Sequence, residues 1–386
     1  MNLITGIDIG NAKTEVAFVE NGNEILLRQP SVIAEILSKP DGNDNEEKSN
    51  VEHLLDNLVV QIFSEGLDRA GMYFVGNKAL QAPQNIKNMN ITIGGKSEED
   101  LPMITSLSLL AGIAIKKYYR SKGSLPKTLS VNVDLATAIP SSEYSKKSAK
   151  MLEDRFKNLH KVNVYVGDKE VLVNINVERC KVTEEGKTSM MAFLNSDNDI
   201  LRHYNETYNE NATVRDFEDA PSLHGDIGDG TSEFVYTKGY NPVPNGSFGE
   251  RVGVGHATND AIRLYRKEIT LVGEITRQHY MDLLKDKGEK SKIANEMMKR
   301  ATGIQASKII DQFKYGFMTY TASTAQYLFV HGGGSVVFKD DMYKPLIKLA
   351  DQIKAQVVWI PEEYATSMNS RGTLYLAQLL FGEDSE

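Results

Sequence analysis

Residues 224–236 read HGDIGDGTSEFVY, and residues 8–18 near the amino terminus read DIGNAKTEVAF. Laid over each other, the two stretches agree as Asp-Ile-Gly, four further residues, a Glu and then alternating apolar positions. The matched pairs are Asp8 with Asp226, Gly10 with Gly228 and Glu15 with Glu233. Each stretch is typical of a strand, a tight glycine turn and a second strand. The duplication indicates two related half-molecules.

The turn of such a hairpin is a ready anion site. Backbone N–H groups without ladder partners point into one concavity, and an Asp just before the turn suits a metal ion. A single glycine turn between strands is more often a plain hairpin, so one such turn alone is weak support for an anion site. Two matched turns favour a grip on the phosphates of one nucleotide from both sides. A third glycine run, residues 332–334, ends an expected strand and lets a base or ribose approach the backbone closely.

The composition is that of a globular protein with more than one domain. The chain has 386 residues, with 41% apolar and 25% charged residues. The net charge of -8 argues against a direct, phosphate-driven grip on DNA. The single cysteine, Cys180, excludes an intrachain disulfide and indicates a reducing compartment, so we expect a cytoplasmic protein. No apolar run approaches the roughly 20 residues of a membrane helix, and no membrane contact is expected.

The expected strands and helices divide the chain into two α/β domains. Domain I is expected at residues 1–190 and about 362–386, with a small insertion subdomain at about 30–100. Domain II is expected at about 220–361, with a helical insertion subdomain at about 257–314. Residues 141–143, Ser-Ser-Glu, are expected to cap a helix that runs to about residue 159. The two common single-loop nucleotide motifs, the P-loop and the Rossmann fingerprint, are absent from the sequence.

Together these stretches resemble the actin, Hsp70 and sugar-kinase superfamily over nearly the whole chain. Residues 8–11 look like its first phosphate motif, residues 226–231 its second, and residues 330–335 its adenosine motif. Within it, the chain is most similar to bacterial actin-like proteins of the ParM type, through residues 73–80, 140–144, 177–186 and 369–372. The resemblance implies two related mixed-sheet domains hinged around a nucleotide, ATP or GTP, with Mg²⁺.

The resemblance also assigns roles to individual residues. Asp8 and Asp226 are expected to hold a hydrated Mg²⁺, and Asp226 also counts as catalytic. Glu185 is expected to position the attacking water, with its neighbour Glu184 as the alternative. The residues expected to contact the nucleotide are Gly10, Asn11, Ala12, Lys13, Gly228, Asp229, Gly230, Thr231, Gly332, Gly333, Gly334 and Ser335.

One position departs from the family pattern. Actins carry a phosphate-contacting Lys where this chain has Glu15, whereas Lys13 stands two residues earlier, on the same side of the strand. Either Lys13 substitutes for it, or the backbone and Thr231 suffice. Three histidines flank the motifs without the spacing of a metal site, and each is expected to be structural or solvated: His224, His256 and His331.

The resemblance implies a filament-forming ATPase that segregates plasmid DNA. The polymer would consist of copies of this chain, and a DNA-binding adaptor protein would attach it to the plasmid, so that no direct nucleic-acid contact is needed. The alternative is a small-molecule kinase or exopolyphosphatase on the same fold. That alternative needs a substrate pocket with a base, for which the sequence offers no distinct signature.

Overall fold

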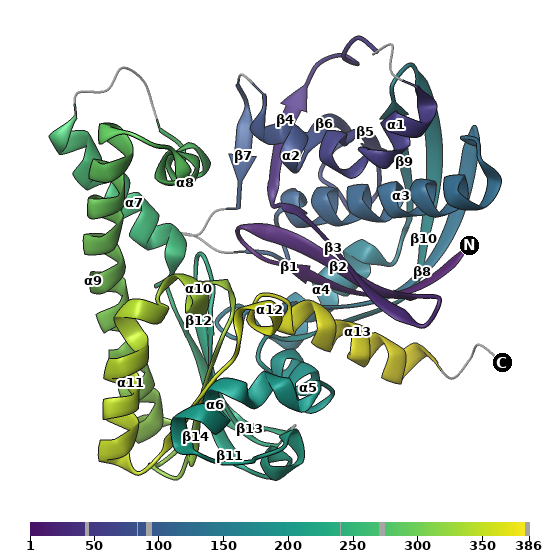
Figure 1. The fold of residues 1–386 in the computed structure, drawn as a ribbon. Helices are drawn as coiled ribbons and strands as arrows, with labels where there is room; N and C mark the ends of the chain where they lie inside the picture. The colour runs from purple at the N-terminus through teal and green to yellow at the C-terminus, as the bar shows by residue number, and fades with distance from the viewer. Residues whose placement is uncertain (43–45, 83, 90–94, 240, 270–274, 383–386) are drawn as a thin grey trace. The chain divides into compact units, whose positions relative to one another are not determined.

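The computed structural model describes residues 1–386 except 43–45, 83, 90–94, 240, 270–274 and 383–386. The chain divides into two compact units. Unit 1 comprises Met1–Ile139, Glu143–Glu184 and Asn369–Glu386, and unit 2 comprises Pro140–Ser142 and Glu185–Met368. Each unit contains one mixed sheet covered by helices, which confirms the predicted α/β class (Figure 1).

Unit 1 is built on a 10-stranded sheet in the order β3-β2-β1-β8-β10-β9-β5-β6-β4-β7. Its strands are β1 Asn2–Ile9, β2 Lys13–Glu20, β3 Asn23–Pro30, β4 Val32–Ile36, β5 Val59–Phe63, β6 Gly71–Val75, β7 Ile86–Asn88, β8 Thr128–Ile139, β9 Leu159–Val166 and β10 Lys169–Glu184. Its helices are α1 Glu47–Glu52, α2 Asn77–Leu80, α3 Asp100–Lys122, α4 Lys146–Phe156 and α13 Met368–Phe381, with a 3₁₀ turn at Leu55–Asn57.

Two helices cover opposite faces of the central strands of unit 1. The apolar helix α3 packs on the face that carries Ile7, and Thr105 of α3 is hydrogen-bonded to Thr14 of β2 at 3.0 Å. Helix α13 lies against the other face, because a Cβ on Gly6 of β1 would come within 2.1 Å of the backbone nitrogen of Leu374. The face under α13 is the one that carries Asp8 and its strand partner.

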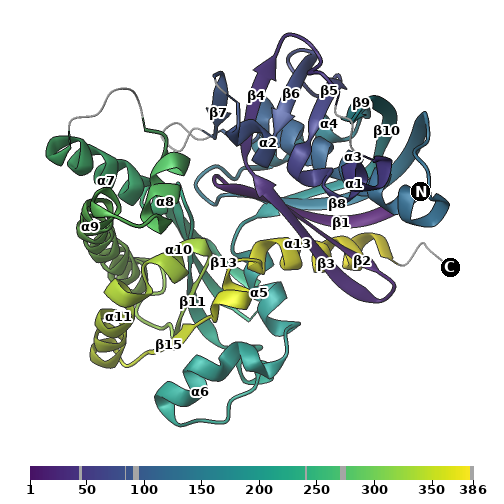
Figure 2. The ribbon, with the colours of Figure 1, turned by 45° about the horizontal axis from the view of Figure 1, so that its top comes forward.

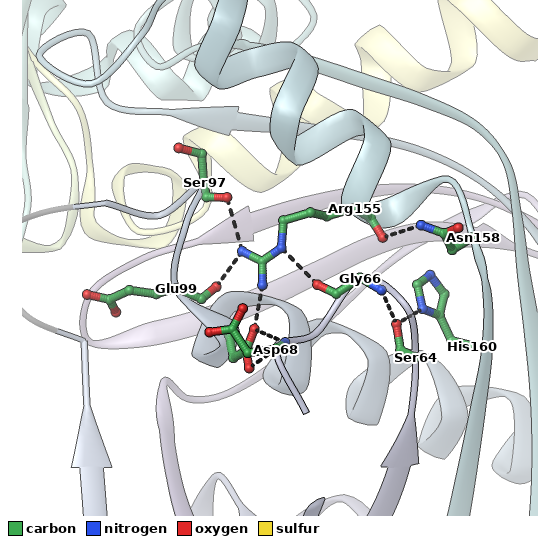
Figure 3. Close-up of polar contacts among 9 residues, drawn as sticks. Ser64, Gly66, Asp68, Ser97, Glu99, Arg155, Asn158 and His160 are labelled. Carbon is green, nitrogen blue, oxygen red and sulfur yellow. Dashed lines mark hydrogen bonds and ion pairs between the residues drawn. The ribbon is translucent and has the colours of Figure 1, made fainter. Parts of the chain in front are cut away.

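A single arginine ties helix α4 to the loops beside it (Figure 3). Arg155 donates to the carbonyl oxygens of Gly66, Ser97 and Glu99 at 2.8, 3.0 and 2.8 Å. It also pairs with the carboxylate of Asp100 at 2.5 Å, where α3 begins. The fixed fork of a guanidinium satisfies these groups together, so Arg155 fastens the insertion to the main sheet of unit 1.

Unit 2 is built on a 5-stranded sheet in the order β13-β12-β11-β14-β15. Its strands are β11 Pro221–Ile227, β12 Ser232–Lys238, β13 Asn241–Glu250, β14 Tyr327–His331 and β15 Gln356–Trp359. Its helices are α5 Lys187–Leu194, α6 Arg202–Tyr208, α7 Val254–Glu268, α8 Arg277–Lys285, α9 Glu289–Thr319, α10 Gly333–Val337, α11 Lys339–Ile353 and α12 Glu362–Ala365, with 3₁₀ turns at Asn198–Leu201 and Val214–Phe217.

The sheet of unit 2 also has a different helical layer on each face. Helices α9 and α11 lie side by side on one face, where Phe313 packs edge-on against Phe234 (Figure 2). On the other face, Phe193 of α5 and Phe217 pack edge-on against Phe329 of β14. The face under α5 is the one that carries Asp226, because Asp226 and His224 alternate with the apolar Leu223, Gly225 and Ile227 along β11.

The five strands at one end of the unit 1 sheet repeat the whole sheet of unit 2. In β3-β2-β1-β8-β10, two antiparallel contacts are followed by two parallel ones. The order β13-β12-β11-β14-β15 has the same senses of pairing. The prediction of two related mixed-sheet halves from the repeated hairpin sequence is therefore confirmed.

One local prediction is wrong. Helix α4 begins after Ser145, whose side chain accepts from the backbone N–H of Ser148, and not at Ser141–Glu143. The physical reason is that Ser142 is used elsewhere, as a donor to a buried carboxylate of unit 2. No helix among the described residues is long and apolar enough to cross a membrane.

We expect Gly225→Ala to destabilise unit 2. A Cβ at Gly225 would lie 2.3 Å from Cζ of the buried Phe313, so the sheet and α9 would have to separate. Overpacking of this kind costs about 1–3 kcal/mol of unfolding free energy, measurable by urea denaturation.

The matched control for this change is Gly303→Ala in α9, where nothing lies within 4 Å of the added Cβ. That variant should gain roughly 0.5–1 kcal/mol from helix propensity. Equal stability of the two variants would contradict the close approach of Gly225 to Phe313.

Candidate phosphate-binding hairpins and their surroundings

The turn between β1 and β2 is closed by a backbone hydrogen bond. The N–H of Gly10 donates to the carbonyl oxygen of Lys13 at 2.9 Å, and Asn11 and Ala12 form the tip. A Cβ on Gly10 would lie 2.8 Å from that same oxygen, so the turn requires glycine here. Asp8 stands two residues before the turn, directly opposite Glu15 in the antiparallel ladder.

The turn between β11 and β12 has the same geometry. The N–H of Gly228 donates to the carbonyl oxygen of Thr231 at 2.9 Å, with Asp229 and Gly230 at the tip. A Cβ on Gly228 would lie 2.7 Å from this oxygen. Asp226 stands opposite Glu233, as Asp8 stands opposite Glu15. The two hairpins therefore share register as well as sequence, and Lys13 occupies the place of Thr231.

In unit 2 the carbonyl groups of this turn are held by the start of helix α7. The N–H groups of Val254 and Gly255 donate to the oxygens of Gly228 and Asp229 at 3.2 and 2.8 Å. His256 Nε2 lies 2.8 Å from the oxygen of Gly230, so this histidine has the structural role expected from the sequence. In a planar trans peptide, the carbonyl and the following N–H point in opposite directions. The N–H groups of residues 229–231 are therefore directed away from α7, as an anion site requires.

The turn of unit 1 is held in a similar way by Ser31. Its hydroxyl donates to the oxygen of Gly10 at 2.6 Å, and its N–H donates to the oxygen of Ala12 at 3.0 Å. By the same peptide geometry, the N–H groups of Asn11 and Lys13 point away from Ser31. Each hairpin thus has a backbone arrangement that suits a phosphate group.

The glutamates opposite the two aspartates are buried, with 0% and 1% exposure for Glu15 and Glu233. Glu15 pairs with Lys13 at 2.9 Å and with Arg28 at 3.1 Å, and it accepts a hydrogen bond from Ser370 of α13 at 2.9 Å. Lys13, which was predicted to lie on the same side of the strand as Glu15, thus forms an ion pair with it. Lys13 keeps 31% of its side chain exposed, so its ammonium group remains accessible to an anionic ligand.

Glu233 accepts hydrogen bonds from a serine that lies outside its hairpin. Ser142 donates to it twice, from its N–H at 3.3 Å and from its hydroxyl at 3.2 Å. Asp229, at the tip of the turn, pairs with Arg277 of α8 at 2.6 Å. The side chain of Asp229 is therefore committed to Arg277, which leaves its backbone N–H as the group that suits a ligand.

The third predicted motif lies beside Asp226. Gly332 has φ of +86°, and a Cβ there would lie 2.3 Å from Oδ1 of Asp226. A Cβ on Gly334 would lie 2.5 Å from Ile227, whereas nothing lies within 4 Å of one on Gly333. The buried hydroxyl of Ser335 donates to the oxygen of Gly332 at 2.8 Å. The structure therefore brings Gly332–Ser335 together with the second hairpin in unit 2.

The two candidate glutamates for water positioning fall on either side of a unit boundary. Glu184 is the last residue of β10, paired with Ile139 in unit 1. Glu185 is the first residue of this segment in unit 2, and only 6% of it is exposed. The next residue, Gly186, has φ of +94°, and its Cβ would lie 2.3 Å from Val235. Val235 is on the Asp226 face of the sheet, so the backbone just after Glu185 passes along that face.

The residues around Asp226 fit a hydrated divalent cation. Asp226 and Glu233 face each other on neighbouring strands, a like-charge pairing that a cation would relieve. The described residues contain no cluster of three or more side chains that could cage a metal ion. Mg²⁺ does not need one, because it keeps most of its water shell and binds through one or two carboxylates and substrate phosphates.

Sequence reasoning did not predict the contacts that Ser142, Arg277, His331 and Ser370 make in this region. Ser142 lies 91 residues from its partner along the chain, Arg277 lies 48 residues from its partner, and Ser370 lies 355 residues from its partner. No local pattern marks such partners. The sequence repeat had already indicated Glu233 as the counterpart of Glu15, and the structure shows in addition that Glu233 is buried.

Comparison with known proteins identifies the fold. Residues 6–187 match the family described as "Actin like proteins N terminal domain". The structure of the actin-like protein Alp7A superposes with a TM-score of 0.70 at 16% identity, covering 100% of this chain and 98% of that chain. ParM of Bacillus thuringiensis, solved with ATP, gives 0.61 at 17% identity, with 98% of both chains covered. A non-polymerisable quadruple mutant of pCBH ParM gives 0.67 at 16%, with 98% and 100% covered. No curated protein sequence matches the chain.

We expect Ser370→Ala to weaken unit 1, because it removes a donor to the fully buried carboxylate of Glu15. Loss of such a partner costs about 1–3 kcal/mol of unfolding free energy, measurable by urea denaturation. The control is Ser307→Ala in α9, whose exposed hydroxyl bonds only to a helix carbonyl among the described residues. It should stay within about 0.5 kcal/mol of the parent protein. A Ser370 variant as stable as the control would show that the bond to Glu15 contributes nothing.

Proposed function

We propose that this chain, whose fold is that of the ParM-type actin-like proteins, is an actin-like nucleoside triphosphatase that assembles into filaments. The observation that carries the proposal is the pair of hairpins with one register, each with an aspartate before a glycine turn. Their backbone carbonyls are held by Ser31 and by α7, which turns the N–H groups outward as phosphate donors. The substrate is ATP or GTP, and copies of this chain are the first partner.

The proposed hydrolysis uses positioning and charge more than covalent chemistry. The turn N–H groups and Lys13 hold the phosphates, and Gly332–Ser335 accommodate the nucleoside. Asp8 and Asp226 would hold Mg²⁺, which supplies neutralisation of phosphate charge when bound. Glu185 orients the attacking water from the Asp226 face of unit 2. Its burial supports this role, because a water-excluding environment strengthens its hydrogen bonds.

We further propose that the filament moves or segregates plasmid DNA through a DNA-binding adaptor protein in the cytoplasm. The net charge of -8 supports indirect attachment, since phosphate-driven binding needs a basic surface. The adaptor would contact the filament and leave the DNA contact to its own basic groups.

Assembly is the property that separates this proposal from a metabolic kinase or exopolyphosphatase. At micromolar protein concentration, ATP or GTP with Mg²⁺ should give polymer that pellets at high speed and scatters light. ADP or GDP with Mg²⁺, and nucleotide with EDTA, should leave the protein in the supernatant. Steady nucleotide turnover without scattering over a wide range of protein concentration would favour a metabolic enzyme.

We expect Glu185→Ala to slow hydrolysis by roughly 10²–10⁴-fold while nucleotide still binds, the usual effect of losing a positioned acid–base group. The matched control is Glu184→Ala, one residue earlier, on the far side of the unit boundary. Phosphate release and the dissociation constant of a fluorescent nucleotide are the two measurements. A larger loss in the Glu184 variant would transfer the role to that residue.

A further inference from the structure

A row of three polar side chains crosses the sheet of unit 2 at the ends of its central strands. Asp226 of β11 is paired with Glu233 of β12 on one side and with His331 of β14 on the other. Paired residues of neighbouring strands present their side chains on the same face. His331 therefore stands beside the carboxylate for which we propose a metal, on the side opposite Glu233.

His331 is buried and lacks the partners that a buried imidazole normally has. Only 1% of it is exposed, and neither ring nitrogen has a hydrogen-bond partner among the described residues. Its Nδ1 lies 3.6 Å from Oδ1 of Asp226. This separation exceeds the range of an N–H···O bond, and a shift of about 0.5 Å would close it.

A second buried histidine in the same layer shows the contrast. His224 lies two residues before Asp226, and its Nε2 is 3.1 Å from the hydroxyl of Thr237. Its ring stacks on Phe329, with centroids 4.6 Å apart. Burial, with His331 nearby, lowers the pKa of His224 to about 3. His224 is thus a satisfied core residue, as expected from the sequence, whereas His331 points an unused nitrogen at Asp226.

The backbone after His331 restricts the same carboxylate oxygen. A Cβ on Gly332 would lie 2.3 Å from Oδ1 of Asp226 and 2.5 Å from the carbonyl oxygen of Ile227. Oδ1 is therefore approached by both His331 and Gly332. A carboxylate fixed through one oxygen presents the other in a defined direction, which is what a cation held through few protein ligands requires.

We propose that His331 is a positioning residue that orients Asp226 toward the metal of the nucleotide complex. Its Nδ1–H donates to Oδ1 of Asp226, and it touches neither the nucleotide nor the metal. This inference rests on the proposed function. It also links the segment proposed for the nucleoside, which begins at Gly332, to the carboxylate proposed for the cation.

The test compares nucleotide affinity with and without the metal. Dissociation constants for ATP, or GTP if that is the substrate, are measured by calorimetry in Mg²⁺ and in EDTA, below the concentration at which polymer forms. In His331→Leu, the gain in affinity from Mg²⁺ should shrink by about 10–100-fold, the usual effect of losing a partner behind a metal ligand. The constant in EDTA should stay at the parent value, and the thermal unfolding midpoint should not fall, because Leu replaces a buried imidazole without hydrogen-bond partners among the described residues.

Two amide variants identify the nitrogen that acts. The amide nitrogen of Asn takes the place of Nδ1 and that of Gln the place of Nε2, so His331→Asn should restore the Mg²⁺ effect and His331→Gln should not. The control is His224→Leu, which removes the other buried imidazole and should leave the Mg²⁺ effect unchanged while lowering stability.

Three results would overturn the proposal: an unchanged Mg²⁺ effect in His331→Leu, an equal loss in the Leu and Asn variants, or an equal loss in His224→Leu. Failure of the proposed function has a different signature. It would be seen in the parent protein, as nucleotide affinity that is the same in Mg²⁺ and in EDTA, and it would overturn the role of His331 as well.

Discussion

The structure depends on a register constraint that sets one carboxylate opposite another in each half of the molecule. Like charges directly opposite each other in a ladder are unfavourable, and burial of one of them raises the cost. Asp8 faces the buried Glu15, and Asp226 faces the buried Glu233. A one-residue slip would remove the clash, but it would also move every apolar residue of the strand to the wrong face. The core therefore holds the register, and the carboxylates must find other partners.

The two halves satisfy this requirement differently. In unit 1, Lys13 and Arg28 neutralise Glu15, and Ser370 at the start of α13 donates to it. In unit 2, Glu233 accepts from the N–H and the hydroxyl of Ser142. Each buried glutamate thus accepts a hydrogen bond from a serine outside its own hairpin, although the two serines belong to segments that do not repeat each other.

The sequence predicted those parts of the molecule that are encoded locally. The repeated Asp-Ile-Gly stretches predicted both hairpins and the relation between the two sheets, because turn chemistry and strand alternation act over a few residues. Ser142 and Ser370 could not be predicted, since each reaches its glutamate across 91 or 355 residues of chain. The helix expected to start at Ser141–Glu143 failed for the same reason. In the sequence Ser142 is typical of a helix cap, whereas in the fold it donates to the buried carboxylate of Glu233.

Strand register also explains why the histidines of this region are of two kinds. From the sequence, His224, His256 and His331 were equivalent, each next to a glycine motif and without a metal-binding spacing. Strand register separates them: His224 lies one row behind Asp226, where Thr237 satisfies it, and His331 lies in the row of Asp226 itself. A buried polar group without a partner lowers stability, so a fold that keeps one beside an acidic side chain has a reason other than stability. Orientation of that carboxylate is the reason that the geometry of unit 2 supports.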